Sequence, residues 1–296
     1  MSVALIADPP TRRRRYRPRR ILIEAASVAL GVVLVIWSLM PVYNMLLIAL
    51  DPEGENEFDG YLWPPEPTLN SFRQVWTEGH WYLEHFWHQF GNSLYIGLLT
   101  MFLTVLIGSL ASFAVGRMRL SKASLLTDTA LLIYVIPASL LAIPFAGLVR
   151  SYGLSDNIWA VITAEVMFAT PFTVLILHQY AKLIPIELDE AARVDGASPV
   201  QVYLRIYLPL MAPALAAVGT YALLLAWDEY LYQYMLLSSP RNWTVAVTIE
   251  QFFDGDEAPW NYMMAMAIMY ALPPVAIFYA LSRYMATGLT TGGVKG

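Results

Sequence analysis

The sequence predicts an all-α polytopic membrane protein with six transmembrane helices, and three observations support this fold class. First, the 296 residues are 57% hydrophobic and only 14% charged, whereas soluble domains are nearer a quarter charged. Second, six apolar runs are each long enough, as helices, to cross a hydrocarbon layer of roughly 30 Å. Third, most basic residues fall in alternate loops, as expected of a chain that crosses a membrane repeatedly.

The six apolar runs define one predicted membrane domain, 21–287, between a basic segment at 1–20 and a tail at 288–296. The predicted spans are 25–50, 90–116, 125–149, 158–180, 209–236 and 262–284. Prolines interrupt several of these spans, and each removes a backbone hydrogen bond and is expected to kink its helix. They are Pro41, Pro137, Pro144, Pro171, Pro273 and Pro274. Ordinary helix bending and broken helices around a translocation path both explain such prolines.

The distribution of basic residues predicts the orientation of the chain. Fifteen of the eighteen lysines and arginines lie in 1–20, 117–124, 181–208 and 283–296. By the positive-inside rule, both termini are then cytoplasmic. The run TRRRRYRPRR in the first segment is interpreted as a topology anchor on anionic lipid headgroups rather than as a nucleic-acid site. The apolar run that follows is too long for the core of a cleavable signal peptide.

The predicted extracytoplasmic loop 51–88 is acidic at its start and aromatic at its end. Residues 70–90 are expected to form a partly amphipathic helix at the membrane surface. His85 and His88 share a face of that helix, but no carboxylate or cysteine completes a recognised metal spacing. We therefore predict interfacial histidines and no metal site. The complete absence of cysteine excludes disulfides, thiolate metal sites and cysteine nucleophiles.

The polar segment ELDEAARVDGASPVQVYLRIYLP, residues 187–209, separates two predicted spans and has the signals of two short helices. Glu187 begins an acidic first turn that suits the helix dipole, and Gly196 is a natural left-handed terminator. Ser198 then caps a second helix, with Gln201 completing a capping box. Helices this short are marginal alone, and the chain offers little cytoplasmic mass of its own. A soluble partner is therefore expected to pack against them.

Carboxylates within the spans are candidates for a substrate path, and hydrogen bonding between helices or at the membrane interface explains them at least as well. Glu165 and the adjacent pair Asp228 and Glu229 are expected in the outer half of their spans. On the helix expected over 209–236, the paired carboxylates point about 100° apart and cannot face one cavity equally. Aromatic residues cluster nearby, namely Tyr221, Trp227, Tyr230, Tyr232 and Tyr234. Rings that stack on sugars and rings that form a membrane-interface belt look alike at this stage.

The segment at 187–209 resembles the EAA loop of binding-protein-dependent ABC importer permeases. Glu190-Ala191-Ala192 is followed at the family's spacing by Gly196, and then by Ile206, one residue, and Leu208-Pro209. The surrounding PFTVLILHQYAKLIPIELDEAARVDGAS is similar to the sugar-importing branch, and the tail GLTTGGVKG is similar to that of the second membrane subunit of the maltose importer. WDEYLYQYML also resembles that branch, with Asp228 where asparagine is usual. The resemblance extends over roughly 70–296.

This resemblance implies a type I ABC importer permease fold with cytoplasmic coupling helices in a bacterial inner membrane. It implies import of a carbohydrate or related polar solute, driven by ATP. The expected partners are a second homologous permease, two copies of a cytoplasmic ATP-binding subunit, an extracytoplasmic solute-binding protein and membrane lipid, with no nucleic acid.

The resemblance also implies roles for particular residues. In the coupling loop 182–209, the residues expected to meet the ATPase are Glu187, Glu190, Ala191, Ala192, Asp195, Gly196 and Ser198. The tail residues expected to contact it are Gly292, Gly293 and Lys295. The candidate substrate path comprises Glu165, Trp227, Asp228, Glu229 and Tyr232.

The energy source is expected on another chain. None of the three lysines follows a glycine in a Walker phosphate loop, so we predict a non-catalytic subunit whose partner holds ATP and magnesium. An ion-coupled secondary transporter is the rival class, since such proteins also place carboxylates and broken helices within the membrane. A membrane-embedded hydrolase is a third class, but the sequence lacks H-E-x-x-H and G-x-S-x-G motifs.

Overall fold

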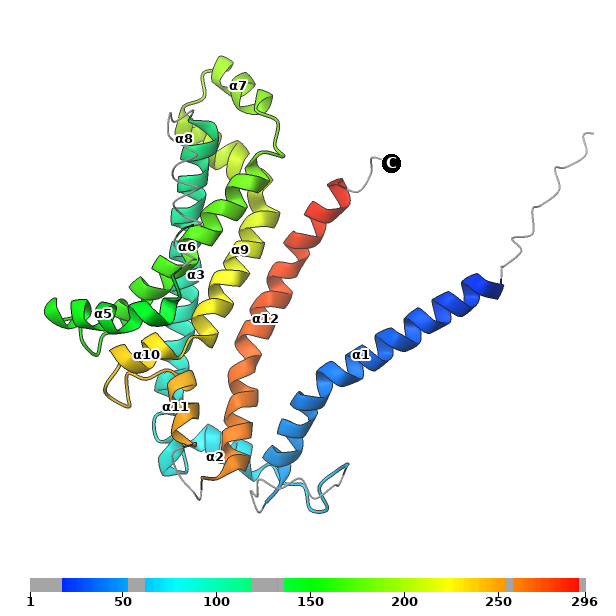
Figure 1. The fold of residues 1–296 in the computed structure, drawn as a ribbon, viewed down its shortest axis with the longest axis vertical. Coiled ribbons are helices and arrows are strands. Elements are labelled where there is room, and N and C mark those ends of the chain that lie inside the picture. Colours follow the sequence, from blue (N-terminus) through cyan, green and yellow to red (C-terminus); the bar gives the residue numbers. More distant parts are fainter. Residues whose placement is uncertain (1–17, 53–61, 119–131, 133–135, 254–257, 293–296) are drawn as a thin grey trace, which may run out of the picture.

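The computed structural model describes residues 18–52, 62–118, 132, 136–253 and 258–292. These residues form helices and connecting turns, and no strand occurs among them. A bundle forms the body of the fold (Figure 1): α3 (Phe86–Arg117) packs against both α6 (Ile158–Ala181) and α9 (Leu208–Asp228). The last helix, α12 (Trp260–Gly292), packs on α9. Shorter helices lie at the ends and along the side of this bundle: α2 (Asn70–Thr77), α5 (Ala138–Ser151), α7 (Glu187–Val194), α8 (Pro199–Val202), α10 (Leu231–Leu236) and α11 (Val245–Gln251).

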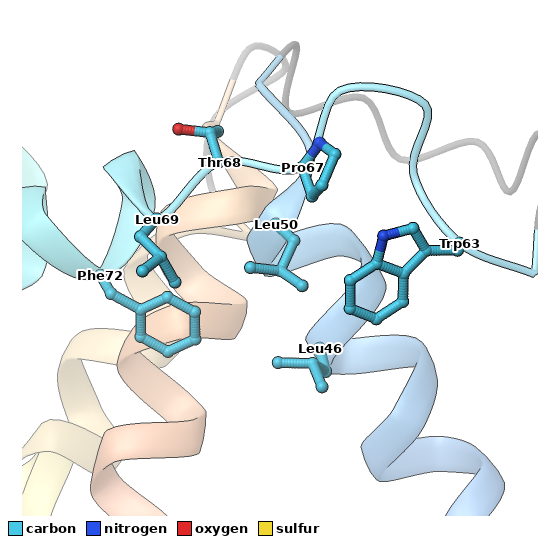
Figure 2. A pocket seen from close by; sticks show the side chains of 7 residues that line it. All are labelled: Leu46, Leu50, Trp63, Pro67, Thr68, Leu69 and Phe72. Carbon is cyan, nitrogen blue, oxygen red and sulfur yellow. The ribbon is translucent and has the colours of Figure 1, made fainter.

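The first helix, α1 (Pro18–Leu50), is attached to the bundle only by its C-terminal part. It packs on α12 near that end, and Figure 1 shows the remainder diverging from the bundle. Residues 22–44 are all exposed, although most are large and apolar. Where α1 meets the following loop, an apolar pocket of about 490 Å³ forms (Figure 2). Its lining residues are Leu46, Leu50, Trp63, Pro67, Thr68, Leu69 and Phe72.

Within the described residues, five helical stretches are long and apolar enough to cross a membrane. They are Leu22–Leu50, Trp81–Arg117, Ile158–Ala181, Pro199–Asp228 and Trp260–Met285. The predicted span 125–149 corresponds in part to α5, which has 14 residues. That length is short of the roughly 20 residues that a crossing needs. Most of 125–135 lies outside the described residues.

The prediction of one helix over 209–236 is wrong at both ends. A continuous helical path begins at Pro199 in α8, passes through a π-helical segment at Tyr203–Tyr207 and ends at Asp228. Glu229 is then extended, with φ −74° and ψ 130°. Its carboxylate accepts hydrogen bonds from the backbone N–H groups of Tyr232 (2.8 Å) and Gln233 (3.2 Å). The side chain thereby caps α10, which starts as a separate helix.

The prediction of one helix over 70–90 is also wrong. α2 ends at Glu78, which takes a left-handed conformation with φ 52°. His80 is extended, a single 3₁₀ turn follows at Trp81–Leu83, and α3 begins at Phe86. Glu78 Oε1 accepts a hydrogen bond from Trp87 N at 2.9 Å. A carboxylate that satisfies an otherwise unpaired N–H of the next helix favours this break.

The last helix extends further than predicted. The sequence places its end near 284, but α12 runs unbroken through Pro273 and Pro274 to Gly292. The first residues of the predicted tail 288–296 therefore continue this helix. Gly293 and Lys295 lie outside the described residues.

Small side chains on α3 allow its neighbours to approach closely. The buried small residues include Gly97, which meets Leu223 and Trp227 of α9, and Gly108, which meets α6. The tightest point is Gly108, where an added Cβ would lie 2.4 Å from Thr173 Cγ2 of α6. Because packed interiors leave no room for such an atom, the two helices would have to separate.

We therefore expect Gly108→Ala to destabilise the protein by about 1–3 kcal/mol, the usual cost of overpacking. Gly91→Ala is the matched control on the same helix, since an added Cβ there meets nothing within 4 Å. It should be neutral or stabilising, because alanine favours helix over glycine by up to about 1 kcal/mol. Thermal unfolding of the detergent-purified variants measures both effects. Equal unfolding temperatures would contradict the close packing at Gly108.

Candidate functional sites

The helix–turn–helix predicted from 187–209 is present in the structure. α7 starts at Glu187, and Gly196 has the predicted left-handed backbone, with φ +85°. Ser198 Oγ accepts a hydrogen bond from Gln201 N (3.3 Å), and Gln201 Oε1 accepts one from Ser198 N (2.7 Å), so the capping box is complete. Local signals in the sequence specify this element correctly.

One face of this helix pair is open. Six of the seven residues predicted to meet an ATPase are exposed, and Ala192 is half-buried. Apolar side chains are exposed among them, with Val194 of α7 88% exposed and Val200 of α8 64% exposed. A surface that combines exposed carboxylates with exposed aliphatic groups is typical of a contact with another protein.

The other face of α7 is fixed by a buried ion pair. Arg117 Nε, at the end of α3, lies 3.4 Å from Asp189 Oδ2, and both side chains are at most 4% exposed. Arg117 also donates hydrogen bonds to the carbonyl oxygens of Ala181 (3.0 Å) and Ile184 (2.9 Å), just before α7. Sequence reasoning counted Arg117 only as a topology charge and Asp189 only as a helix-dipole residue. Nothing in the sequence indicates that two residues so far apart are paired.

The π-helical segment after α8 is also tied to α3. The Tyr203 hydroxyl lies 2.8 Å from Ser109 Oγ, and the Tyr207 hydroxyl lies 2.9 Å from Ser112 Oγ. The Phe113 ring contacts both tyrosine rings edge-on, at 5.3 and 5.0 Å. A force on α7 or α8 therefore acts on α3 and α9 through buried, specific contacts.

Three of the five candidate path residues come together nearer the opposite end of the bundle. Glu165 of α6 is 1% exposed, and the Glu229 carboxyl is the titratable group beside it. Tyr232 is buried beside them: its hydroxyl donates to the Ala138 carbonyl oxygen at 2.7 Å, and its ring meets Phe168 edge-on at 5.0 Å. Buried carboxyl groups in apolar surroundings are typical of functional sites.

The other two candidates do not join this cluster. Trp227 stacks on Tyr270 of α12, with ring centroids 4.7 Å apart, and packs against Gly97 of α3. Asp228 is exposed. Because Glu229 lies beyond the end of α9, the expectation of two carboxylates 100° apart on one helix is wrong.

The turn between α5 and α6 is held to the segment between α10 and α11 by polar side chains that the sequence does not single out. Asp156 accepts hydrogen bonds from the backbone N–H groups of Ser238 (2.8 Å) and Ser239 (3.0 Å) and from Asn242 Nδ2 (3.0 Å). Partial burial alone would raise the pKa of Asp156. The hydrogen bonds from Ser239, Ser238 and Asn242 outweigh it and hold the pKa below its usual value.

The histidines at and just before the start of α3 do not form a metal centre in the part of the chain that the structure describes. His88 Nε2 lies 3.1 Å from the Arg241 guanidinium, and His85 precedes the first turn of α3. No group of three histidine, aspartate or glutamate side chains within the described residues has the geometry to hold a metal ion.

Comparison with known proteins identifies the family. The family described as "Binding-protein-dependent transport system inner membrane component" matches residues 98–291. The inner membrane ABC transporter permease protein YcjP of Escherichia coli is 34% identical over 237 residues, covering 78% of this chain and 84% of that protein. The trehalose transport system permease protein SugB of Mycobacterium tuberculosis is 30% identical over 262 residues, covering 88% of this chain and 93% of that protein.

A solved structure shows the same fold. A bacterial ABC transporter involved in the import of the acidic polysaccharide alginate aligns with a TM-score of 0.75 over 93% of this chain and 99% of that chain, at 19% identity. The family match does not favour the ion-coupled secondary transporter. The chain belongs to the family of binding-protein-dependent transport system inner membrane components and is a multi-pass ABC importer permease.

Proposed function

We propose that this chain is one permease subunit of an ATP-driven importer that moves a carbohydrate or related polar solute into a bacterial cytoplasm. Its partners are a second homologous permease, two copies of an ATP-binding subunit and an extracytoplasmic binding protein, with both termini cytoplasmic. Relatives named for trehalose and arabinooligosaccharides support a saccharide cargo, as does the alginate importer with the same fold.

The coupling role is supported by the helix pair α7–α8, which is fixed to the bundle on one face and exposed on the other. Its inner face is held to α3 by Arg117 and Asp189, while Glu190 and Val194 lie on exposed positions. The chain has no Walker loop, so ATP and magnesium belong to the partner and this subunit is non-catalytic. In this proposal, the tail residues Gly292, Gly293 and Lys295 also contact the ATP-binding subunits.

The proposed cargo path passes the cluster of Glu165, Glu229 and Tyr232. Two carboxyl groups side by side in apolar surroundings are suited to exchange hydrogen bonds with the hydroxyl groups of a passing sugar. Aromatic rings beside them offer faces for sugar C–H groups. Trp227 and Asp228 remain proposed path residues, although they lie outside this cluster; Asp228 is exposed and open to a partner permease.

Reconstitution of the full complex in vesicles tests this proposal. Uptake of a labelled saccharide should require both ATP and the binding protein. Glu165→Gln should reduce uptake by about fivefold to tenfold, the effect of losing one buried hydrogen-bonding contact, with assembly and basal ATP hydrolysis unchanged. Glu250→Gln, at an exposed carboxylate of α11, is the control and should transport normally.

Different experimental outcomes would contradict different parts of this proposal. Normal uptake by the Glu165→Gln complex, or its failure to assemble, would remove Glu165 from the path and leave the permease function standing. Saccharide uptake driven by an ion gradient without the ATP-binding subunits would contradict the proposed function itself.

A further inference from the structure

A second pocket opens beside the start of α3 and α11, and none of the residues of the Glu165 cluster lines it. It has a volume of about 550 Å³ and lies between the start of α3 and the segment 240–251. The side chains that give it its chemistry are Trp81, Tyr82, Glu84, His85, Gln89 and Trp243. None of the candidate path residues lines it. Its size and its mixture of rings with a few polar groups are those of small-ligand sites.

The two walls of this pocket are fixed to each other by hydrogen bonds. Gln89 Nε2 donates to the Pro240 carbonyl oxygen at 3.0 Å. One turn further along α3, Asn92 Nδ2 donates to the Trp243 carbonyl oxygen, also at 3.0 Å. The Tyr82 ring stacks on Phe252, with centroids 4.5 Å apart. The pocket is therefore formed before any ligand arrives, which reduces the entropic cost of binding.

The polar chemistry of the pocket requires a hydrogen-bond donor. Gln89 is 3% exposed, and its Oε1 has no partner within the described residues, although its Nε2 is bonded. A buried acceptor of this kind is stable only if a donor from a ligand or an ordered water meets it. Glu84, on the exposed rim, supplies further acceptor oxygens.

The apolar chemistry requires a flat, partly apolar ligand. Trp81 is 70% exposed, and one face of its indole rests on Tyr82, with centroids 3.7 Å apart. The ring is thus supported from behind and open in front. An open indole face beside hydroxyl-accepting oxygens is complementary to a sugar ring, which has apolar C–H faces and a rim of hydroxyl donors.

We propose that this pocket is an entrance subsite that holds one sugar ring of the cargo before it reaches the Glu165 cluster. The ring stacks on Trp81, one hydroxyl donates to Gln89 Oε1, and another donates to the Glu84 carboxylate. This inference rests on the proposed function only in taking a saccharide as cargo.

Equilibrium dialysis of the full complex in nanodiscs, without binding protein or ATP, tests the subsite. The probe is radiolabelled maltotriose, with trehalose and arabinotriose as competitors. The wild-type complex should bind with a dissociation constant on the order of 1 mM, as expected of a site with few contacts. Trp81→Ala and the near-isosteric Gln89→Met should each weaken binding by about fivefold to tenfold, the effect of losing one stacking or hydrogen-bonding contact.

Trp159→Ala is the matched control. Trp159 is a 53% exposed tryptophan at the start of α6 and does not line the pocket. Its variant should bind as the wild type does. Because Trp81 is mostly exposed, Trp81→Ala keeps the test valid if Gln89→Met fails to fold.

Three results would overturn the subsite. Saccharide uptake with no detectable binding would mean that the pocket holds only water, and the proposed function would stand. Binding unaffected by Trp81→Ala would place the sugar elsewhere. A loss of affinity for the binding protein, with saccharide binding intact, would make the pocket a protein contact. By contrast, failure of the complete system to import any saccharide would count against the proposed function.

Discussion

Replacement of Arg117 by methionine should destabilise the permease by about 3–5 kcal/mol, the usual cost of removing one partner of a buried ion pair. The methionine side chain fills similar space but leaves the Asp189 carboxylate buried without a cation. It also removes the donors to the carbonyl oxygens of Ala181 and Ile184. Chemical unfolding of the purified complex, followed by tryptophan fluorescence, measures the loss.

The double variant Arg117→Met with Asp189→Leu separates charge from packing. Replacing a buried pair by apolar side chains is often neutral or stabilising, so the double variant should recover most of the lost stability. Its ATP hydrolysis should nevertheless respond more weakly to the binding protein, because the directional link between α3 and α7 is gone. Wild-type stability in the single variant would show that the ion pair does not hold α7 in place.

The second large effect is expected at Glu190. Glu190→Lys should abolish the stimulation of ATP hydrolysis by the loaded binding protein, because it reverses the charge on the exposed face that we propose meets the ATP-binding subunit. Affinity for the binding protein, which we propose docks at the opposite end, should not change. Stimulation is measured as the ratio of ATP hydrolysis rates with and without loaded binding protein.

Two further variants calibrate this prediction. Glu250→Lys, the same charge reversal on the exposed surface of α11, should leave stimulation intact. Gly196→Pro should reproduce the loss, since proline cannot take the φ of +85° found there. Full stimulation with Glu190→Lys would contradict the assignment of this face to coupling.

The parts of the fold that sequence predicted correctly are those specified by neighbouring residues. The capping box of Ser198 and Gln201 and the left-handed Gly196 depend on contacts within a few positions. Long apolar runs likewise identify α1, α3, α6, α9 and α12, because membrane insertion depends on summed hydropathy.

The parts that sequence could not predict depend on polar side chains. Some of these pair with residues far away in the sequence, and others break a helix inside a segment whose average hydropathy favours a continuous one. Asp189 and Arg117 are far apart in the sequence and meet only through the tertiary fold. Glu229 lies within an apolar run, yet its carboxylate ends α9 by capping α10. Glu78 breaks the expected surface helix in the same way, by capping α3. In the last two cases a carboxylate that caps the following helix outweighs the average propensity of its segment.

The unpaired acceptor oxygen of Gln89 could not be predicted from the sequence either. Its isolation results from the surrounding packing, not from its neighbours in the sequence. The grouping of Glu165 with Glu229 and Tyr232 likewise required the chain break after Asp228, which turns α10 back against α6.

Site-directed cross-linking tests the docking of α7–α8 on an ATP-binding subunit most directly. The natural chain has no cysteine, so one can be introduced at Val194, which is 88% exposed on α7. In the assembled complex, a short bismaleimide should join Val194→Cys to a single cysteine placed in the facing surface of the ATP-binding subunit. Trp159→Cys, exposed at the start of α6 away from α7, is the control and should give no product with that subunit. Absence of the adduct at position 194, or equal yields at both positions, would contradict the coupling role of this helix pair.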